Sequence, residues 1–129
     1  MKSKKKTTSL EENAVIYRDE SDDVWIAHGL HTDQVGTGRR IVDALADLIK
    51  AVDQVCALAR RDNSIALLRE APAAVKRMFR SAKPLPSEIY EVAHKMARGK
   101  WPDYISPDFS PRVDAAPFKA EVSTVFASK

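Results

Sequence analysis

The stretch VWIAHGLHTDQVGTGRRIVDALADLIKAVDQVCALARR, residues 24–61, decides the fold of this chain. Residues 24–31 are rich in β-forming side chains that alternate between two faces, so they predict a half-buried strand. A short polar turn follows, and residues 35–40 (VGTGRR) predict a second, weaker strand. Two glycines in VGTGRR are expected to let the chain bend from this strand into the next element.

The spacing of apolar residues changes at residue 41 from the period of a strand to the period of a helix. Over residues 41–61 the apolar positions recur at steps of four and three, which is typical of an amphipathic helix. Aspartates near its start and arginines at its end suit the helix dipole. The apolar stripe must be buried, and the preceding sheet is the nearest surface. The stripe consists of Ile41, Leu45, Leu48, Val52, Val55 and Ala59.

The segments upstream complete a small sheet. Residues 13–19 (NAVIYRD) predict a strand, and the charged turn ESDD joins it to residues 24–31. Short connections of this kind are typical of an antiparallel meander. We therefore expect an α+β fold, with a three-stranded antiparallel sheet packed by one long helix.

The remainder of the chain predicts helices and then irregular structure. Residues 73–83 predict a second helix, and Ser87 is expected to cap a third helix that Gly99 ends. Residues 101–129 hold four prolines among aromatic residues, which predicts a proline-rich tail and no core element.

The resulting domain organisation has three parts. Residues 1–12 are polar and lysine-rich, and they predict a disordered basic arm. Residues 13–100 form a single α+β domain with a helical extension, and residues 101–129 form the tail.

Composition restricts the class of protein. The 129 residues are 44% hydrophobic and 30% charged, as in ordinary globular proteins of one domain. The single cysteine, Cys56, leaves no internal disulfide, and no apolar run reaches membrane-spanning length, so we expect a cytoplasmic protein. Four of the 21 basic residues lie in the first six positions, so the rest of the chain holds 17 basic against 18 acidic residues.

No motif in the sequence indicates a catalytic, metal-binding or cofactor-binding site. His28 and His31 are three residues apart on a predicted strand, which places them on opposite faces. The Gly36-Thr37-Gly38 run lacks the third glycine of a dinucleotide-binding loop, since Ile41 stands in its place. Cys56 lies on the apolar edge of the long helix, where cysteine usually acts as a small hydrophobic residue. We therefore predict a non-enzymatic protein without metal or cofactor.

Residues 14–60 resemble the HicB-like antitoxin family. The resemblance rests on Trp25-Ile26-Ala27, on Gly38 before the helix, and on Asp43-Ala44-Leu45 followed by Leu48. Where the family usually has threonine before the helix, this chain has Arg40. The resemblance implies a β-β-β-α core like a partial RNase H fold without its catalytic carboxylates. It also implies a binding role, because HicB proteins neutralise small mRNA-cleaving HicA toxins by covering them.

These observations lead to a first hypothesis of a protein-binding module. Its partner would be a small basic toxin of the HicA type, met by an acidic turn next to a tryptophan. The family often dimerises, and an exposed edge strand at residues 14–18 would permit a homodimer. The expected partner-binding residues are Asp19, Glu20, Asp22, Asp23 and Trp25.

A second hypothesis is a nucleic-acid-associated protein. It would use the N-terminal arm and the basic segment that follows the long helix. The residues expected to carry this alternative are Lys4, Lys5, Lys6, Lys76, Arg77 and Arg80.

Overall fold

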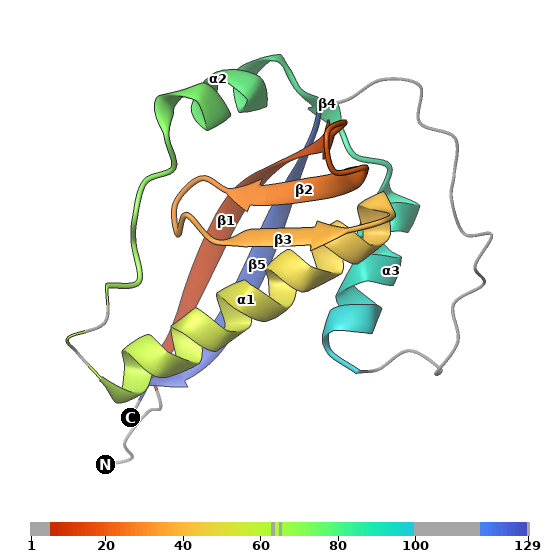
Figure 1. Ribbon diagram of the computed structural model, residues 1–129. Helices are drawn as coiled ribbons and strands as arrows, with labels where there is room; N and C mark the ends of the chain where they lie inside the picture. Colours follow the sequence, from red (N-terminus) through yellow and green to blue (C-terminus); the bar gives the residue numbers. More distant parts are fainter. Residues whose placement is uncertain (1–5, 63, 65, 100–116, 129) are drawn as a thin grey trace, which may run out of the picture.

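A computed structural model shows an α+β fold in which helices lie on both faces of a five-stranded mixed sheet (Figure 1). The structure describes residues 6–62, 64, 66–99 and 117–128. The sheet has the strand order β3-β2-β1-β5-β4, and β4 runs parallel to β5. The elements are β1 (Lys6–Asp19), β2 (Val24–Gly29), β3 (Val35–Gly38), α1 (Ile41–Arg61), α2 (Ala73–Ser81), β4 (Lys83–Pro84), α3 (Ser87–Ala97) and β5 (Phe118–Ser128).

The predicted meander and long helix are present. β1, β2 and β3 pair antiparallel in sequence order, and α1 spans the predicted residues 41–61. Gly36 and Gly38 face α1, and the helix approaches them so closely that a Cβ atom at Gly36 would lie 2.2 Å from the backbone nitrogen of Leu48. The glycines therefore set the distance between strand and helix, in addition to easing the bend between them.

The sheet has two more strands than the three that were expected, because β5 and β4 extend it beyond β1. Residues 118–128 form β5, although residues 101–129 were expected to be an irregular tail. Pro117 is the last proline of the chain, so β5 itself contains none, and the buried residues Phe118 and Val122 keep the spacing of one strand face. The part of the predicted tail from residue 101 to 116 lies outside the described residues.

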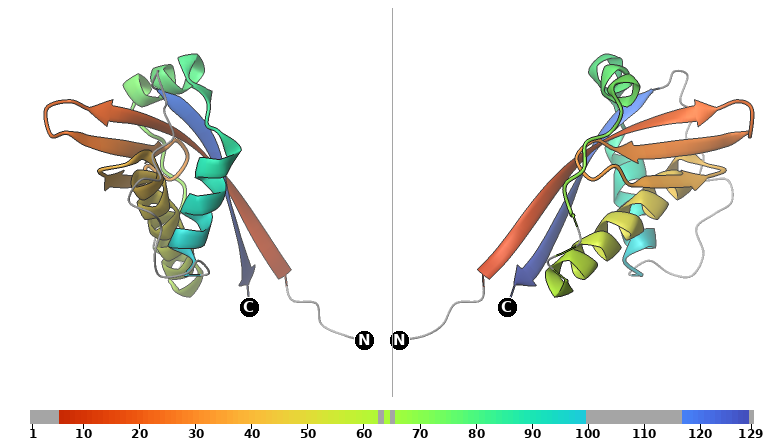
Figure 2. Two further views of the ribbon diagram at one scale, coloured as in Figure 1. Left: turned by 90° about the vertical axis from the view of Figure 1, so that its right-hand side faces the viewer. Right: turned by 60° about the vertical axis from the view of Figure 1, so that its left-hand side comes forward.

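The expectation of a disordered N-terminal arm was wrong for residues 6–12. Residues 6–12 were expected to be disordered, yet they form the first half of β1 and pair with β5 from Lys6↔Ser128 onward. Residues 6–13 pair with β5 alone, so β1 and β5 extend as a two-stranded ribbon beyond β2 and β3 (Figure 2). This half of β1 is stabilised by a strand more than a hundred residues later, which local sequence does not reveal. Residues 1–5 of the expected arm, including Lys4 and Lys5, lie outside the described residues.

The position of β1 contradicts the expected edge strand. β1 lies between β2 and β5, and Ala14, Val15 and Ile16 are fully buried. Residues 14–16 therefore cannot act as an exposed edge for dimerisation, whereas Tyr17 and Arg18 pair with β2 alone.

The two faces of the sheet are covered by different helices (Figure 2). Ala14 and Ile16 of β1 point to the core beneath α1 and α3, whereas Val15 points to a smaller core beneath α2. This alternation follows from the two-residue period of a strand. The larger core contains Ile41, Leu45, Leu48 and Val52 of the predicted stripe, other residues of α1, and Ile89 and Val92 of α3. Val55 and Ala59 of the predicted stripe are only half-buried.

Neither α1 nor α3 has a side-chain cap at its N-terminus. Ser87 is the first residue of α3, and the cap position is held by Pro86 with no side-chain cap. The expectation that Ser87 caps this helix was wrong, while Gly99, just beyond its end, adopts the expected positive φ of 67°. At the start of α1 the side chain of Arg40 makes no cap, and its guanidinium instead binds Asp43 with two hydrogen bonds of 2.8 and 2.9 Å.

Candidate functional site

The turn between β1 and β2 contains the acidic residues that the sequence singled out. Asp19 accepts hydrogen bonds from the backbone nitrogen and the hydroxyl of Ser21, at 3.1 and 2.6 Å, which lower the pKa of Asp19. Asp23 has a positive φ of 54° and pairs with Arg18 of β1. These two carboxylates thus shape the turn itself.

The other two carboxylates of the turn remain available to a partner. Glu20 and Asp22 are exposed, and neither forms a hydrogen bond or ion pair through its side chain with a described residue. The four predicted acidic residues therefore divide into two that hold the turn and two that face solvent.

A pocket of about 400 Å³ lies beside this turn, and we call it the turn pocket. It brings together three of the five predicted partner-binding residues, while Asp19 and Glu20 are outside its lining. Trp25 is half-buried in this pocket, and in the register of the sheet it lies between Arg18 on β1 and Gly38 on β3. The lining residues are Arg18, Asp22, Asp23, Val24, Trp25 and Arg39.

Two arginines of the turn pocket were not predicted. Arg18 is paired with Trp25 in the hairpin register, a placement that the sequence indicates once the ESDD turn is fixed. Arg39 follows β3 and reaches the pocket only because β3 lies next to β2. Both cations offset part of the negative charge of the turn, so the surface is mixed and less acidic than the turn sequence suggests.

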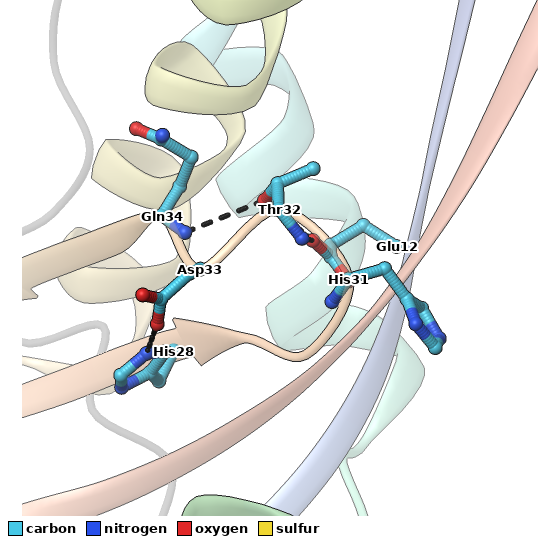
Figure 3. A network of polar contacts seen from close by, with 6 residues as sticks. All are labelled: Glu12, His28, His31, Thr32, Asp33 and Gln34. Carbon is cyan, nitrogen blue, oxygen red and sulfur yellow. Dashed lines mark hydrogen bonds and ion pairs between the residues drawn. The ribbon is translucent and has the colours of Figure 1, made fainter. Parts of the chain in front are cut away.

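A second polar cluster lies in the turn between β2 and β3 (Figure 3). Glu12 is completely buried, and its carboxylate accepts the backbone N–H groups of His31 and Thr32 at 2.7 and 2.6 Å. The hydroxyl of Thr32 donates to the same carboxylate at 2.5 Å and accepts the N–H of Gln34 at 3.4 Å. Among the described residues, the hydrogen bonds of this carboxylate all go to the turn, so it holds the turn in place.

The histidines of the opening stretch have separate partners. The ring nitrogen Nε2 of His28 lies 2.6 Å from a carboxylate oxygen of Asp33, while Nε2 of His31 lies 3.3 Å from the amide nitrogen of Asn13. Asp33 lies five residues after His28, and the β2–β3 turn brings their side chains together. The positive φ of Asp33, 56°, turns the chain back so that its carboxylate returns to β2.

Metal-binding residues do not gather in the described part of the chain. Among residues 6–62, 64, 66–99 and 117–128, no three His, Cys, Asp or Glu side chains are arranged to hold a metal ion. Within those same residues no helix is long and apolar enough to cross a membrane.

Cys56 is buried in the core between α1 and the sheet. Burial, helped by Asp53 and Glu12, raises the pKa of its thiol to about 11. A thiol with this pKa is almost entirely protonated at neutral pH, so Cys56 does not supply a reactive thiolate.

His94 of α3 is half-buried, and its Nε2 atom is buried without a hydrogen-bond partner among the residues that the structure describes. Its ring lies 4.5 Å from the ring of Tyr90. Burial, with a contribution from Arg98, lowers the pKa of His94, whereas Asp53 acts in the opposite direction.

We expect the folded state to lose stability as the pH falls through the unfolded pKa of histidine, about 6.5, because the unfolded chain then binds a proton that the folded chain disfavours. Replacing His94 by leucine is expected to reduce the loss of stability between pH 7.5 and 5.5. Urea unfolding of both proteins at the two pH values measures this difference. An equal pH dependence in the two proteins would show that other groups cause it.

Among the described basic residues of the alternative hypothesis, Lys6 is separate from the others, which share α2. Lys6 begins β1, whereas Lys76, Arg77 and Arg80 lie on α2. Lys76 forms a 2.9 Å ion pair with Glu70, and Arg77 and Arg80 are exposed.

No family model, no curated protein and no solved structure matches this chain.

Proposed function

We propose that this chain is a non-catalytic, HicB-like protein-binding module that neutralises a small basic mRNA-cleaving toxin of the HicA type in the cytoplasm. The observation that carries this proposal is the turn pocket, in which Asp22 and Asp23 lie beside the half-buried Trp25. A tryptophan surrounded by charged groups is a common anchor of protein interfaces. The exposed carboxylates of the same turn would attract a basic partner.

The order of elements also supports the proposal. The resemblance over residues 14–60 implies three strands followed by a helix, and β1, β2, β3 and α1 occur in this order. The turn pocket lies at the end of this unit, between the β1–β2 turn and the residues just before α1. A partner docked there would contact the ends of β1 and β2, the turn that joins them, and Arg39.

Reversing the charge of the two available carboxylates tests the electrostatic part of the proposal. We expect Glu20→Lys with Asp22→Lys to slow association with a HicA-like ribonuclease about tenfold at low salt, because the steering field of the turn is inverted. Stopped-flow or surface plasmon resonance measures the association rate. The difference should shrink as salt is added.

A matched control separates local charge from net charge. Glu91→Lys with Glu121→Lys makes the same change in net charge at two exposed positions on α3 and β5. This control should bind at close to the wild-type rate.

The neutralising role has its own test. Small basic HicA-like ribonucleases from the host of this chain are incubated with mRNA, with and without the chain, and cleavage is measured. We expect one of them to be inhibited at equimolar ratio, and Trp25→Ala to weaken the inhibition at least tenfold, as truncation of an interface anchor does. If none of these ribonucleases is inhibited, the antitoxin role is wrong.

A further inference from the structure

The outer side of α2 carries positive charge that the proposed toxin-binding role does not use. α2 contains three basic residues, Lys76, Arg77 and Arg80, and no acidic residue. Residues on its inner side, Val75 with Met78 and Phe79, belong to the small core that holds α2 against β1 and leaves the basic residues outward. Arg80 is three residues from Arg77 and four from Lys76, so its side chain is a neighbour of both on the helix surface.

The tertiary structure adds a fourth cation from a distant part of the chain. Lys119 of β5 pairs with Val15 in the register of the sheet, which places it on the α2 side. Its Nζ atom lies 5.8 Å from the centre of the Phe79 ring, a cation–π distance. We call Lys76, Arg77 and Arg80 the α2 basic surface, and Lys119 flanks α2 through its contact with Phe79. Lys83 is not part of the α2 basic surface, because its register partner is Phe118, whose side chain lies in the core on the opposite face.

Neutralisation of this surface by neighbouring acids is incomplete. Glu70 pairs with Lys76, and the hydrogen bond from Lys76 lowers the pKa of Glu70. Glu70 is 81% exposed, so this pair is screened by solvent and holds the lysine weakly. Arg77 and Arg80 form no ion pair with a described residue.

We propose that the α2 basic surface binds the phosphate backbone of nucleic acid without reading its base sequence. Arginine forks match phosphate oxygens, and contacts to phosphate oxygens hold a protein on nucleic acid without reading base edges. An acidic protein is the less suitable partner, because the large apolar residues of α2 are directed into the core and leave little for an interface anchor. DNA and RNA share the phosphodiester chemistry, and the experiment separates them.

The experiment measures fluorescence anisotropy of a labelled duplex DNA of about 20 base pairs, and of a single-stranded RNA of similar length, as the full chain is added at several salt concentrations. The test variant is Arg77→Glu with Arg80→Glu. The control, Lys50→Glu with Arg61→Glu, changes the net charge equally at two exposed positions of α1. Circular dichroism melting confirms that both variants fold.

We expect the test variant to bind at least tenfold more weakly than the control, and its plot of log affinity against log salt to lose a slope of about 2 on duplex DNA. The nucleic acid that shows this difference identifies the preferred source of phosphate. Equal weakening of the test and control variants would assign binding to net charge, and would overturn the proposal. Binding to vesicles of anionic lipid without binding to either nucleic acid would also overturn it.

Discussion

Replacing Glu12 by alanine is expected to lower the free energy of unfolding by about 3 kcal/mol or more, because three hydrogen-bond donors lose their acceptor inside the protein. These donors are the backbone nitrogens of His31 and Thr32 and the hydroxyl of Thr32. The side chain of Glu12 is fully buried, so water cannot replace it without opening the turn between β2 and β3. For a domain of ordinary stability this is a large fraction of the total. Urea unfolding followed by circular dichroism measures the change.

The neighbouring glutamate gives a matched control for this prediction. Glu11 lies on the same strand, carries the same side chain and is exposed. Its replacement by alanine should change stability by about 0.5 kcal/mol or less. A Glu12→Ala protein that unfolds within about 1 kcal/mol of wild type would mean that the carboxylate does not hold the turn.

Replacing Gly36 by alanine is expected to lower the free energy of unfolding by about 3 kcal/mol, through a clash between strand and helix. A Cβ atom at this position would lie 2.2 Å from the backbone nitrogen of Leu48 and 2.5 Å from the backbone oxygen of Ala44. Backbone atoms cannot rotate away as a side chain would, so α1 must move off β3 and the buried stripe of the helix must repack. The midpoint of thermal unfolding, measured with wild type and variant side by side, reports this loss.

Thr37 provides the comparison on the same strand. Its side chain is exposed on the face of β3 that points away from α1, so Thr37→Ala should be nearly neutral. Comparable losses for Gly36→Ala and Thr37→Ala would indicate that strand propensity, and not the approach of α1, sets the effect.

The predictive value of the sequence was highest where the signal was local and repeated. The span of α1 was predicted correctly, since a period of about 3.6 maintained for five turns has no good alternative as a strand. The hairpin between β1 and β2 was also recognised, and with it the neighbourhood of Asp22, Asp23 and Trp25 in the turn pocket. The pairing of His28 with Asp33 was missed, because it depends on a positive φ at an aspartate.

The sequence by itself determined the α+β class, the meander, the long helix and the acidic turn. Only the tertiary structure decided that residues 6–12 and residues 118–128 are strands, that β1 is central, and that Lys119 joins α2. Each segment has too little periodicity to define a strand alone, and each becomes ordered by hydrogen bonds to the other. The burial of Glu12 has the same origin, since a carboxylate enters a core only where donors from a distant turn meet it. Pairing across more than a hundred residues is a property of the folded chain, and no local pattern contains it.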